Sequence, residues 1–416
     1  MIVSETEIKL PAKKMCKEAL STHYEDIREA KRRGEPIGYC TAQFAKELFE
    51  SMDLKVMYPE NHSAAIAAKD RPLANGYLEY AENMGYSTDL CSYSRINIGY
   101  CISGKECGMD LDVPMPDYVI VGTNICNMSV RWYENLAWYY KIPYIMIDMP
   151  FNCAATVPEH KTEYMVQQFE YAIKQLEEIS GKKFDYDKFR ETQEIANHNG
   201  DLYQQGLDLI GHDPSPANGH DSLNYMALMV TMKGSLKTTA VLEQWIAELK
   251  ESVAEGKTTF KGEAKHRIMF EGIACWPHLK YCSDCMSSMG CNWTGSPYTN
   301  LFHQVYTDMR EMVNCYATIV SNSSQVMWQE RRDRIVKEYK IDGILCDITR
   351  SCKPMIGKLM ESNRMLEKKY GIPAALFDGD QSDPRALSKA QFETRLQGLV
   401  EIMEENKKGG NKNEIA

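Results

Sequence analysis

Short apolar runs alternate with helix-length amphipathic segments over the first third of the chain. The runs at 36–41, 54–58, 118–122 and 143–148 are almost wholly apolar, and a helix-length segment or a loop follows each one. Runs of this kind are typical of strands that a parallel sheet buries on both faces. The pattern therefore predicts a parallel α/β unit in this part of the chain.

The pattern becomes helical from about residue 156 to residue 256. Residues 160–181 place apolar side chains at three- and four-residue spacing and end in a glycine, and residues 238–256 repeat this format. Such spacing with a glycine stop is typical of amphipathic helices. The middle third is therefore predicted to be helical.

The last third returns to the α/β pattern. Apolar runs at 267–276, 343–348 and 374–379 are predicted strands, and segments 353–371 and 391–405 are predicted helices. The fold class that follows is α/β, with two Rossmann-like parallel-sheet domains and a helical domain between them.

We expect three domains in this chain. Residues 1–155 would form an N-terminal helix and the first α/β domain, residues 156–260 the helical domain, and residues 261–416 the second α/β domain. The tail 407–416 is polar and contains glycine, so we expect it to be disordered.

The charge of the chain narrows the classes of partner. The chain has 416 residues and a formal net charge of −10. Nucleic acids and anionic membrane surfaces bind basic faces, so this charge argues against both. The start lacks the apolar core of a signal peptide, and no stretch of about 18 apolar residues occurs. We expect a cytoplasmic protein that binds neither nucleic acid nor membrane.

Phosphate-binding loops are absent from the sequence. It contains no G-x-x-x-x-G-K-[ST] motif, and no G-x-G-x-x-G motif follows a predicted strand. These glycine-rich loops bind the phosphates of ATP and of dinucleotide cofactors. The chain is therefore not expected to bind ATP, flavin or nicotinamide cofactors by these routes.

Three of the 14 cysteines lie where a site in an α/β protein would form. Cys126 and Cys352 follow predicted strands through short loops, and Cys91 lies in a polar segment ahead of a helical stretch. Ligands of open α/β sheets gather at the carboxyl ends of the strands, so these thiols could converge. Three thiolates suit an iron–sulfur cluster with one open iron, although spacing alone does not single out this set.

A second group of cysteines allows a competing interpretation. Cys282 and Cys285 form a C-x2-C pair, which is a common element of zinc and iron–sulfur sites, and Cys275 and Cys291 lie nearby. The pair lies in a segment that is predicted to be helical and lacks a matching second pair. We prefer a core role for these cysteines and for Cys346, with an extra metal as the alternative.

The acidic run after the last predicted strand also has two interpretations. Asp378, Asp380 and Asp383 could hold a divalent cation. We prefer a structural role, in which the aspartates cap turns and Arg385 pairs with one of them.

Blocks along most of the chain resemble the larger, alpha-type subunit of the 2-hydroxyacyl-CoA dehydratases, a family that also includes benzoyl-CoA reductase subunits. The resemblance covers roughly residues 20–405, and its blocks are YPENHSAA (58–65), DLCSYSR (89–95), NICN and WYEN (124–135), IPYIMIDMPFN (142–152), ISGKKFD (179–185), EGIACWPHL (271–279), TRSCK (349–353) and FDGDQSDPRA (377–386).

The resemblance implies a cofactor and its ligands. By that resemblance, Cys91, Cys126 and Cys352 would carry a [4Fe-4S] cluster whose fourth iron has an exchangeable site. Arg350 and Lys353 flank the last cysteine and would either offset the charge of the cluster or serve only as solvated loop cations.

The resemblance also implies a reaction and its partners. The chain would remove water from an (R)-2-hydroxyacyl-CoA to give a 2-enoyl-CoA, through a ketyl radical that one-electron activation produces. Its partners would be a smaller dehydratase subunit in a heterodimer, a transient ATP-dependent iron–sulfur activator and the acyl-CoA substrate. The alternatives are an aryl-CoA reductase subunit of the benzoyl-CoA type and a non-catalytic subunit that carries a cluster for electron transfer.

Glu60 is the candidate acid–base residue, because it directly follows a predicted strand. The alternative is an acid that the N-terminus of a helix stabilises. His62 could do the same work, but a lone histidine is more often structural. The family carries hydroxyl side chains across the nearby turn, whereas this chain has Ala42 after Cys40 and Thr41, which puts the identity of the substrate in doubt.

Overall fold

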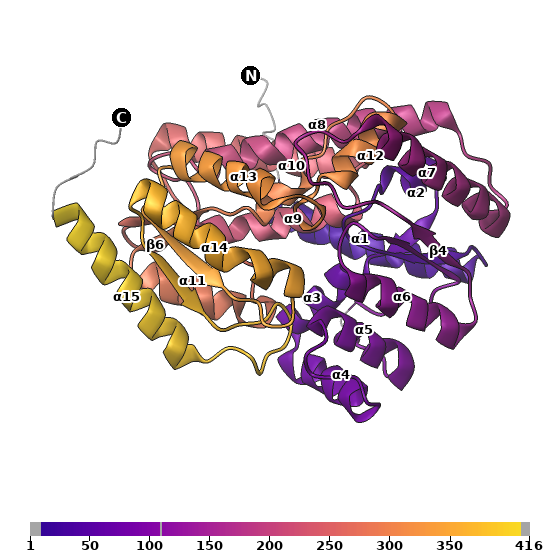
Figure 1. Cartoon of the computed structure of the whole chain (residues 1–416), viewed down its shortest axis with the longest axis horizontal. Coiled ribbons are helices and arrows are strands. Elements are labelled where there is room, and N and C mark those ends of the chain that lie inside the picture. The colour runs from indigo at the N-terminus through magenta and orange to yellow at the C-terminus, as the bar shows by residue number, and fades with distance from the viewer. Residues whose placement is uncertain (1–9, 109, 409–416) are drawn as a thin grey trace, which may run out of the picture.

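The computed structural model describes residues 10–108 and 110–408 and shows an α/β fold with two parallel sheets of four strands (Figure 1). The first sheet has the order β2-β1-β3-β4. Its strands are β1 (Ile37–Cys40), β2 (Lys55–Met57), β3 (Tyr118–Gly122) and β4 (Tyr144–Ile147). The second sheet has the order β6-β5-β7-β8. Its strands are β5 (His266–Glu271), β6 (Cys291–Gly295), β7 (Gly343–Asp347) and β8 (Ala374–Phe377).

The two sheets share one topology, in which the first and third strands along the chain are neighbours. The order of the strands reverses between β1 and β3 in one sheet and between β5 and β7 in the other. Ligands of open α/β sheets bind at such points, beyond the carboxyl ends of the strands. We call the part of the molecule that carries the first sheet the first half, and the part that carries the second sheet the second half. Each half therefore offers one expected binding edge.

Helices surround both sheets. In the first half they are α1 (Ala12–Arg32), α2 (Glu47–Ser51), α3 (Pro59–Lys69), α4 (Arg71–Asn83), α5 (Ser92–Ser103) and α6 (Asn127–Tyr140). The middle third contains α7 (Glu159–Ser180), α8 (Tyr186–Ile210), η1 (Gly219–Asp221), α9 (Ser222–Thr231) and α10 (Leu236–Glu255). The last third contains η2 (Trp276–His278), α11 (Leu279–Ser288), η3 (Thr299–Phe302), α12 (Met309–Ala317), η4 (Val320–Asn322), α13 (Gln325–Glu338), α14 (Lys353–Tyr370) and α15 (Lys389–Lys408).

The seven predicted strands and the helical middle third are confirmed, but the sequence analysis missed β6. This strand contains Asn292 and Thr294, and both side chains are buried. Asn292 Nδ2 donates to the Ala217 carbonyl at 2.9 Å, and Asn292 Oδ1 accepts from the Gly219 amide at 3.1 Å. Because these bonds satisfy the side-chain amide of Asn292, a strand with a polar sequence can be buried. The predicted strand 267–276 is also shorter than expected, because Gly272 turns the chain with φ +91°.

One large apolar cluster joins the middle helices to both sheets. It contains Phe44 near the first sheet, Phe169 and Trp245 from α7 and α10, and Phe270 and Phe377 from β5 and β8. Figure 1 shows α8 and α10 along one side of the molecule, where they pack against each other. The domain boundaries at 155 and 260 stay a prediction.

A network of four charged side chains fastens the two halves together. Arg95 of α5 pairs with Glu82 at 2.6 Å and with Asp383 at 3.3 Å. Arg385 pairs with the same two carboxylates, at 2.6 Å and 2.7 Å. Arg95 is fully buried, so losing both carboxylates would leave a buried charge uncompensated. The predicted pairing of Arg385 with an aspartate is confirmed.

The predicted polar tail at the C-terminus and the start of the chain lie partly or wholly outside the described residues. Lys407 and Lys408 end α15, so this part of the expected tail is helical, whereas 409–416 lies outside the described residues, as does 1–9. None of the helices within 10–408 that the structure describes is long and apolar enough to cross a membrane.

Candidate functional site

The three candidate cysteines each stand immediately before the first residue of a helix. Cys91 precedes α5, Cys126 follows β3 and precedes α6, and Cys352 follows β7 and precedes α14. The N-terminus of a helix carries partial positive charge, which favours a thiolate over a thiol. Figure 1 shows the N-terminal end of α14 directed toward α3 and α6 near the centre of the molecule.

Hydrogen bonds between the two halves bring Cys91 next to the loop that carries Cys352. The side-chain amide of Gln381 donates to Cys91 Sγ at 3.2 Å and to Ser351 Oγ at 3.0 Å. The backbone amide of Ser92 donates to the same Ser351 hydroxyl at 3.1 Å. Cys91 and Cys352 therefore flank one hydrogen-bonded network, although they lie far apart in the sequence.

The charge of Cys126 affects the pKa values of the other two thiols. Burial raises the pKa of Cys91 to about 12, and the neighbouring Cys126 contributes to the rise. Burial, with Cys91 and Cys126 as neighbours, also holds the pKa of Cys352 well above its usual value. Three thiolates in one buried place repel each other, and cationic iron at their centre would reverse that balance. The thiols therefore fit a group that brings positive charge.

The described residues contain no ready set of ligands for a single metal ion. Among the described residues, no three His, Cys, Asp or Glu side chains gather as ligands of one metal ion. In an iron–sulfur cluster the cysteines bind different irons, so their sulfur atoms lie further apart than the ligands of a single ion. The same finding applies to the C-x2-C pair at Cys282 and Cys285 and to the acidic run 378–383, and it supports neither as a single-ion site.

The loop before Cys352 is held by two buried carboxylates. Asp347 Oδ1 accepts from the Thr349 amide at 2.8 Å, and Asp380 Oδ2 accepts from the Ser351 amide at 3.0 Å. Thr349 adopts the left-handed region with φ +51°, which is costly for a β-branched residue and needs such support. The predicted structural role of Asp380 is confirmed, and Asp383 pairs with arginines as described above.

The side chain of Arg350 already has a carboxylate partner, Asp378. It forms an exposed ion pair with Asp378, while Lys353 donates to the Arg350 carbonyl at 3.3 Å. The interpretation of Arg350 as a solvated loop cation is therefore favoured over a role in balancing the charge of a cluster. The carboxylate of Asp378 takes part in the same ion pair.

The other cysteines of the second half lie in its core. Cys346 in β7 is fully buried, as predicted. Cys275 donates from Sγ to Asp347 Oδ2 at 2.9 Å, and both side chains are buried. Cys282 and Cys291 are buried and Cys285 partly buried in the same apolar cluster.

Glu60 has the environment of an acid–base group. It lies in the first turn of α3, directly after β2, and Tyr133 of α6 donates to its Oε2 at 3.1 Å. Its Oε1 is buried and accepts no hydrogen bond within the described chain. Burial raises the pKa of Glu60 to about 7, although the hydrogen bond from the Tyr133 hydroxyl favours the ionised form. An acid stabilised only by the helix terminus would have a lowered pKa, so this alternative is not supported.

Two residues near Glu60, His62 and Lys46, form hydrogen bonds with backbone carbonyls. His62 is fully buried, and its Nε2 lies 2.8 Å from the Leu111 carbonyl, with its pKa lowered to about 4 by burial. Lys46 is buried as well and donates to the carbonyls of Ala42 and Phe44 at 2.7 Å and 3.2 Å. Lys46 thereby fixes the loop after β1, which the sequence analysis did not foresee.

Three aromatic residues near the cysteines were also missed. Trp276 Nε1 donates to Tyr93 Oη at 2.7 Å across the contact between the two halves. Burial raises the pKa of Tyr298 above its usual value. Tyr93 and Trp276 stand inside the blocks DLCSYSR and EGIACWPHL, which could have drawn attention to them. Tyr298 follows the missed strand β6 and had no such signal.

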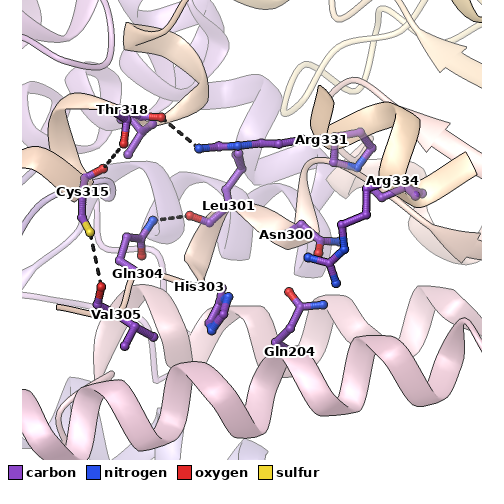
Figure 2. A pocket seen from close by; sticks show the side chains of 13 residues that line it. Gln204, Asn300, Leu301, His303, Gln304, Val305, Cys315, Thr318, Arg331 and Arg334 are labelled. Carbon is purple, nitrogen blue, oxygen red and sulfur yellow. Dashed lines mark hydrogen bonds between the residues drawn. The ribbon is translucent and has the colours of Figure 1, made fainter. Parts of the chain in front are cut away.

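A separate pocket lies between α8, α12 and α13 (Figure 2). Its volume is about 370 Å³, and Arg334 and His303 on its wall pair with Glu338 and Asp201. Leu301 borders the pocket and also packs in the apolar cluster of Cys352. Leu301 therefore links the pocket to the cluster of Cys352. Arg331, a third cation on the wall, donates to the Thr318 carbonyl at 3.0 Å.

Comparison with known proteins identifies the family of this chain. Residues 41–403 match the family described as 2-hydroxyglutaryl-CoA dehydratase, D-component. The chain belongs to this family.

Its relatives include dehydratase subunits of similar length. The (R)-2-hydroxyisocaproyl-CoA dehydratase alpha subunit of Clostridioides difficile is 43% identical over 96% of this chain and 98% of the relative. The (R)-phenyllactyl-CoA dehydratase alpha subunit of Clostridium sporogenes is 40% identical over 90% of this chain and 91% of the relative. A benzoyl-CoA reductase subunit of Thauera aromatica is more distant, at 25% identity over 94% of each chain.

Proposed function

We propose that this chain is the iron–sulfur subunit of a 2-hydroxyacyl-CoA dehydratase, a hydro-lyase that converts an (R)-2-hydroxyacyl-CoA to a 2-enoyl-CoA. The observation that carries the proposal is the hydrogen-bonded network of Gln381, Ser351 and the Ser92 amide, which brings Cys91 next to the loop that carries Cys352. Membership of the dehydratase family supports it.

The reaction needs more than acid–base catalysis. In a 2-hydroxyacyl-CoA the proton to be removed is on C3, which no carbonyl activates directly. General acid–base catalysis contributes about 10²- to 10⁴-fold, which is too little for such a proton. When bound by Cys91, Cys126 and Cys352, a [4Fe-4S] cluster with one exchangeable site would supply one electron to the thioester carbonyl and a Lewis acid for a substrate oxygen.

The residues of the chain then have separate tasks in the ketyl-radical route. The C2–O bond breaks and hydroxide leaves, after which the C3 proton becomes acidic. Glu60 Oε1, which has no hydrogen-bond partner in the described chain, accepts this proton and passes it to the hydroxide as water forms. Tyr133 holds the other oxygen of the carboxyl group in place. Protons balance within the reaction, and the electron is returned at its end.

Relatives named alpha subunits support a partner subunit for this chain. We infer a heterodimer with a smaller subunit, and a transient ATP-dependent iron–sulfur activator that delivers the electron. The chain carries no phosphate-loop motif of its own, which agrees with a separate activator.

An apolar acyl group fits the site better than a charged one. The side chains at the strand ends near the cysteines include Ile125, Ile273 and Leu301, and all are partly buried. Arg350 pairs with Asp378, so it is not free to bind a second carboxylate of a substrate. Both dehydratase relatives named above act, by their names, on substrates with apolar acyl groups.

Two other functions were open from the sequence. An aryl-CoA reductase subunit is less well supported, since the benzoyl-CoA reductase relative has 25% identity against 43% and 40% for the dehydratases. A non-catalytic electron-transfer subunit does not account for the buried oxygen of Glu60 that has no hydrogen-bond partner in the described chain.

The test is turnover by the complex of this chain with its smaller subunit and activator, purified without oxygen. We expect 2-hydroxyisocaproyl-CoA to become the 2-enoyl-CoA, with about four irons and four sulfides bound by this chain. Zinc in place of iron, or reduction of an aryl-CoA without dehydration, would overturn the proposal.

A further inference from the structure

The side-chain amide of Gln381 joins the two halves at one of the candidate cluster ligands. Gln381 lies in the loop after β8, in the second half, and its side chain is fully buried. Its Nε2 donates to Sγ of Cys91, in the first half, at 3.2 Å and to Ser351 Oγ at 3.0 Å. Within residues 10–108 and 110–408, no other side chain donates a hydrogen bond to the sulfur of Cys91.

Hydrogen bonds of the backbone hold the loop that carries Gln381. The Gln381 carbonyl accepts from the Trp276 amide at 3.1 Å. Asp380, the residue before it, accepts from the amides of Ser351 and Ser382, both at 3.0 Å. Because the chain is fixed on both sides of Gln381, the donor to Cys91 is in place before any ligand binds.

The orientation of the Gln381 amide suits a thiolate at Cys91. A cysteine that binds a metal is deprotonated, so its sulfur can only accept hydrogen bonds. Gln381 directs its nitrogen to this sulfur and leaves its buried Oε1 without a partner in the described chain. A protonated Cys91 would favour the reverse orientation, in which Oε1 accepts from the thiol. The amide is therefore arranged for the ionised form of Cys91.

We propose that Gln381 is a positioning residue that raises the reduction potential of the cluster bound at Cys91, by donating a hydrogen bond to this thiolate ligand. The inference rests on the proposed function. Reduction adds one negative charge, so the sulfur accepts a stronger hydrogen bond in the reduced form, and the donor stabilises that form more than the oxidised one. The amide is buried, and low local dielectric strengthens the effect.

The reduction potential governs how the electron enters and leaves the site. A higher potential makes transfer from the activator more favourable and transfer to the thioester carbonyl less favourable, since the free energy of each step follows the difference in potential. Gln381 therefore sets the balance between these two transfers. It does so from the second half, on a ligand that the first half supplies. Gln381 itself keeps both of its N–H protons throughout.

The test is an anaerobic redox titration of the complete dehydratase complex, followed by electron paramagnetic resonance. The signal that Cys352→Ala abolishes identifies the cluster of this chain. Gln381→Met has a side chain of similar length without an N–H group, and it should lower the midpoint potential. We expect the equilibrium to move toward the oxidised form by about tenfold, which is about 59 mV for one electron.

Gln193→Met is the matched control. Gln193 is a buried glutamine of α8 whose side-chain amide donates to the Tyr306 carbonyl, so the same substitution should leave the potential unchanged there. Gln381→Asn keeps the amide on a side chain that is one methylene group shorter. It should also lower the potential, and it is the second variant if Gln381→Met does not fold.

The sign of the shift distinguishes a lost hydrogen bond from a loosened structure. Water that enters a loosened site would stabilise the reduced form, which carries the larger negative charge, and would raise the potential. Loss of the Gln381 donor lowers it. A potential that is unchanged or higher in Gln381→Met and Gln381→Asn would therefore show that the role of Gln381 is wrong, while the dehydratase function stands.

Two further outcomes separate this inference from the proposed function. Loss of iron from both Gln381 variants would overturn the role of Gln381, because the residue would then be needed to retain the cluster and not to tune it. If the unchanged complex holds no iron–sulfur cluster in this chain, the proposed function and the role of Gln381 both fall.

Discussion

The two parallel sheets order their strands in the same way, and each places a cysteine before the helix that follows its third strand. Cys126 stands after β3 in the first sheet, and Cys352 stands after β7 in the second. The surroundings of these equivalent cysteines differ. The first half adds Cys91 and Glu60, whereas the second half adds buried carboxylates that hold its own loop, at Asp347 and Asp380.

The difference lies in how each half uses its acids. Asp347 accepts from the Thr349 amide and the Cys275 thiol, and Asp380 accepts from three backbone amides. Glu60 has one hydrogen bond from Tyr133 and a buried oxygen without a partner. A carboxyl group whose oxygens are fully bonded serves structure, while one with a free oxygen can take a proton. The same topology thus carries an acid with a free oxygen in one half and acids with fully bonded oxygens in the other.

Cys352→Ala should have the largest effect. Removing one thiolate from the predicted set should release the cluster, so we expect iron and sulfide to fall from about four of each per chain and dehydration to become undetectable. Anaerobic iron and sulfide analysis measures this. Cys346→Ala is the matched control, because Cys346 is buried in β7, the strand that precedes the Cys352 loop, and should cost only about 1 kcal/mol of stability with iron retained. Iron that survives Cys352→Ala would contradict the assignment.

Glu60→Gln should reduce kcat by about 10²- to 10⁴-fold with the iron content unchanged. Because burial raises the pKa of Glu60 to about 7, the base is ionised only above that pH, and kcat/KM should rise with pH and level off above about 7. The variant should lose this inflection. Glu79→Gln, at an exposed position on α4, is the control and should keep both the rate and the profile.

The pH dependence of the free energy of unfolding tests the pKa of Glu60 independently of activity. The folded chain retains the Glu60 proton between the ordinary value of 4.5 and about 7, whereas the unfolded chain releases it. The free energy of unfolding should therefore fall as pH rises through this window, and Glu60→Gln should remove that share of the slope. An unchanged slope in the variant would mean that the pKa of Glu60 is not raised.

Arg95→Met tests the fastening between the halves. The substitution leaves Glu82 and Asp383 with Arg385 as their remaining partner, and breaking a buried ion pair costs about 3–5 kcal/mol. Denaturant unfolding should show this loss. Arg364→Met removes an exposed pair with Glu361 and should cost under about 1 kcal/mol. Similar losses for both variants would argue against a buried network.

Asp347→Ala tests the structural role of Asp347 in the second half. It leaves the Thr349 amide and the Cys275 thiol without their acceptor, which costs about 1–3 kcal/mol. Asp347→Asn keeps an acceptor for Thr349 and should cost less. If Asp347→Asn instead reduced kcat as strongly as Glu60→Gln with stability intact, the second half would also carry a reacting acid.

The smallest expected effect concerns the acyl group. We expect kcat/KM for 2-hydroxyisocaproyl-CoA to exceed that for 2-hydroxyglutaryl-CoA by about tenfold or more, because burying an unpaired carboxylate among apolar side chains is costly. Competition between the two substrates measures the ratio. A preference for the carboxylated substrate would require a free cation at the site and would redirect attention to Lys353.

Periodicity predicted the strands of both sheets except β6. It succeeded where apolar runs were continuous, as at 118–122 and 343–347, because burial on both faces leaves a direct trace in the sequence. It failed at β6, where Asn292 is buried but bonded to residues of another segment. It also gave no reason to consider Lys46, because the apolar pattern does not mark a lysine whose buried ammonium group bonds the Ala42 and Phe44 carbonyls.

The sequence by itself determined the α/β class, the family resemblance and the residue types that the chemistry needs, since these depend on local pattern and on blocks of consecutive residues. Only the tertiary structure decided which groups meet. It brought Cys91 beside Ser351, turned Asp380 into a loop anchor and left one oxygen of Glu60 without a partner. The physical reason is that burial and hydrogen-bond partners set the state of a side chain, and residues from both halves supply them.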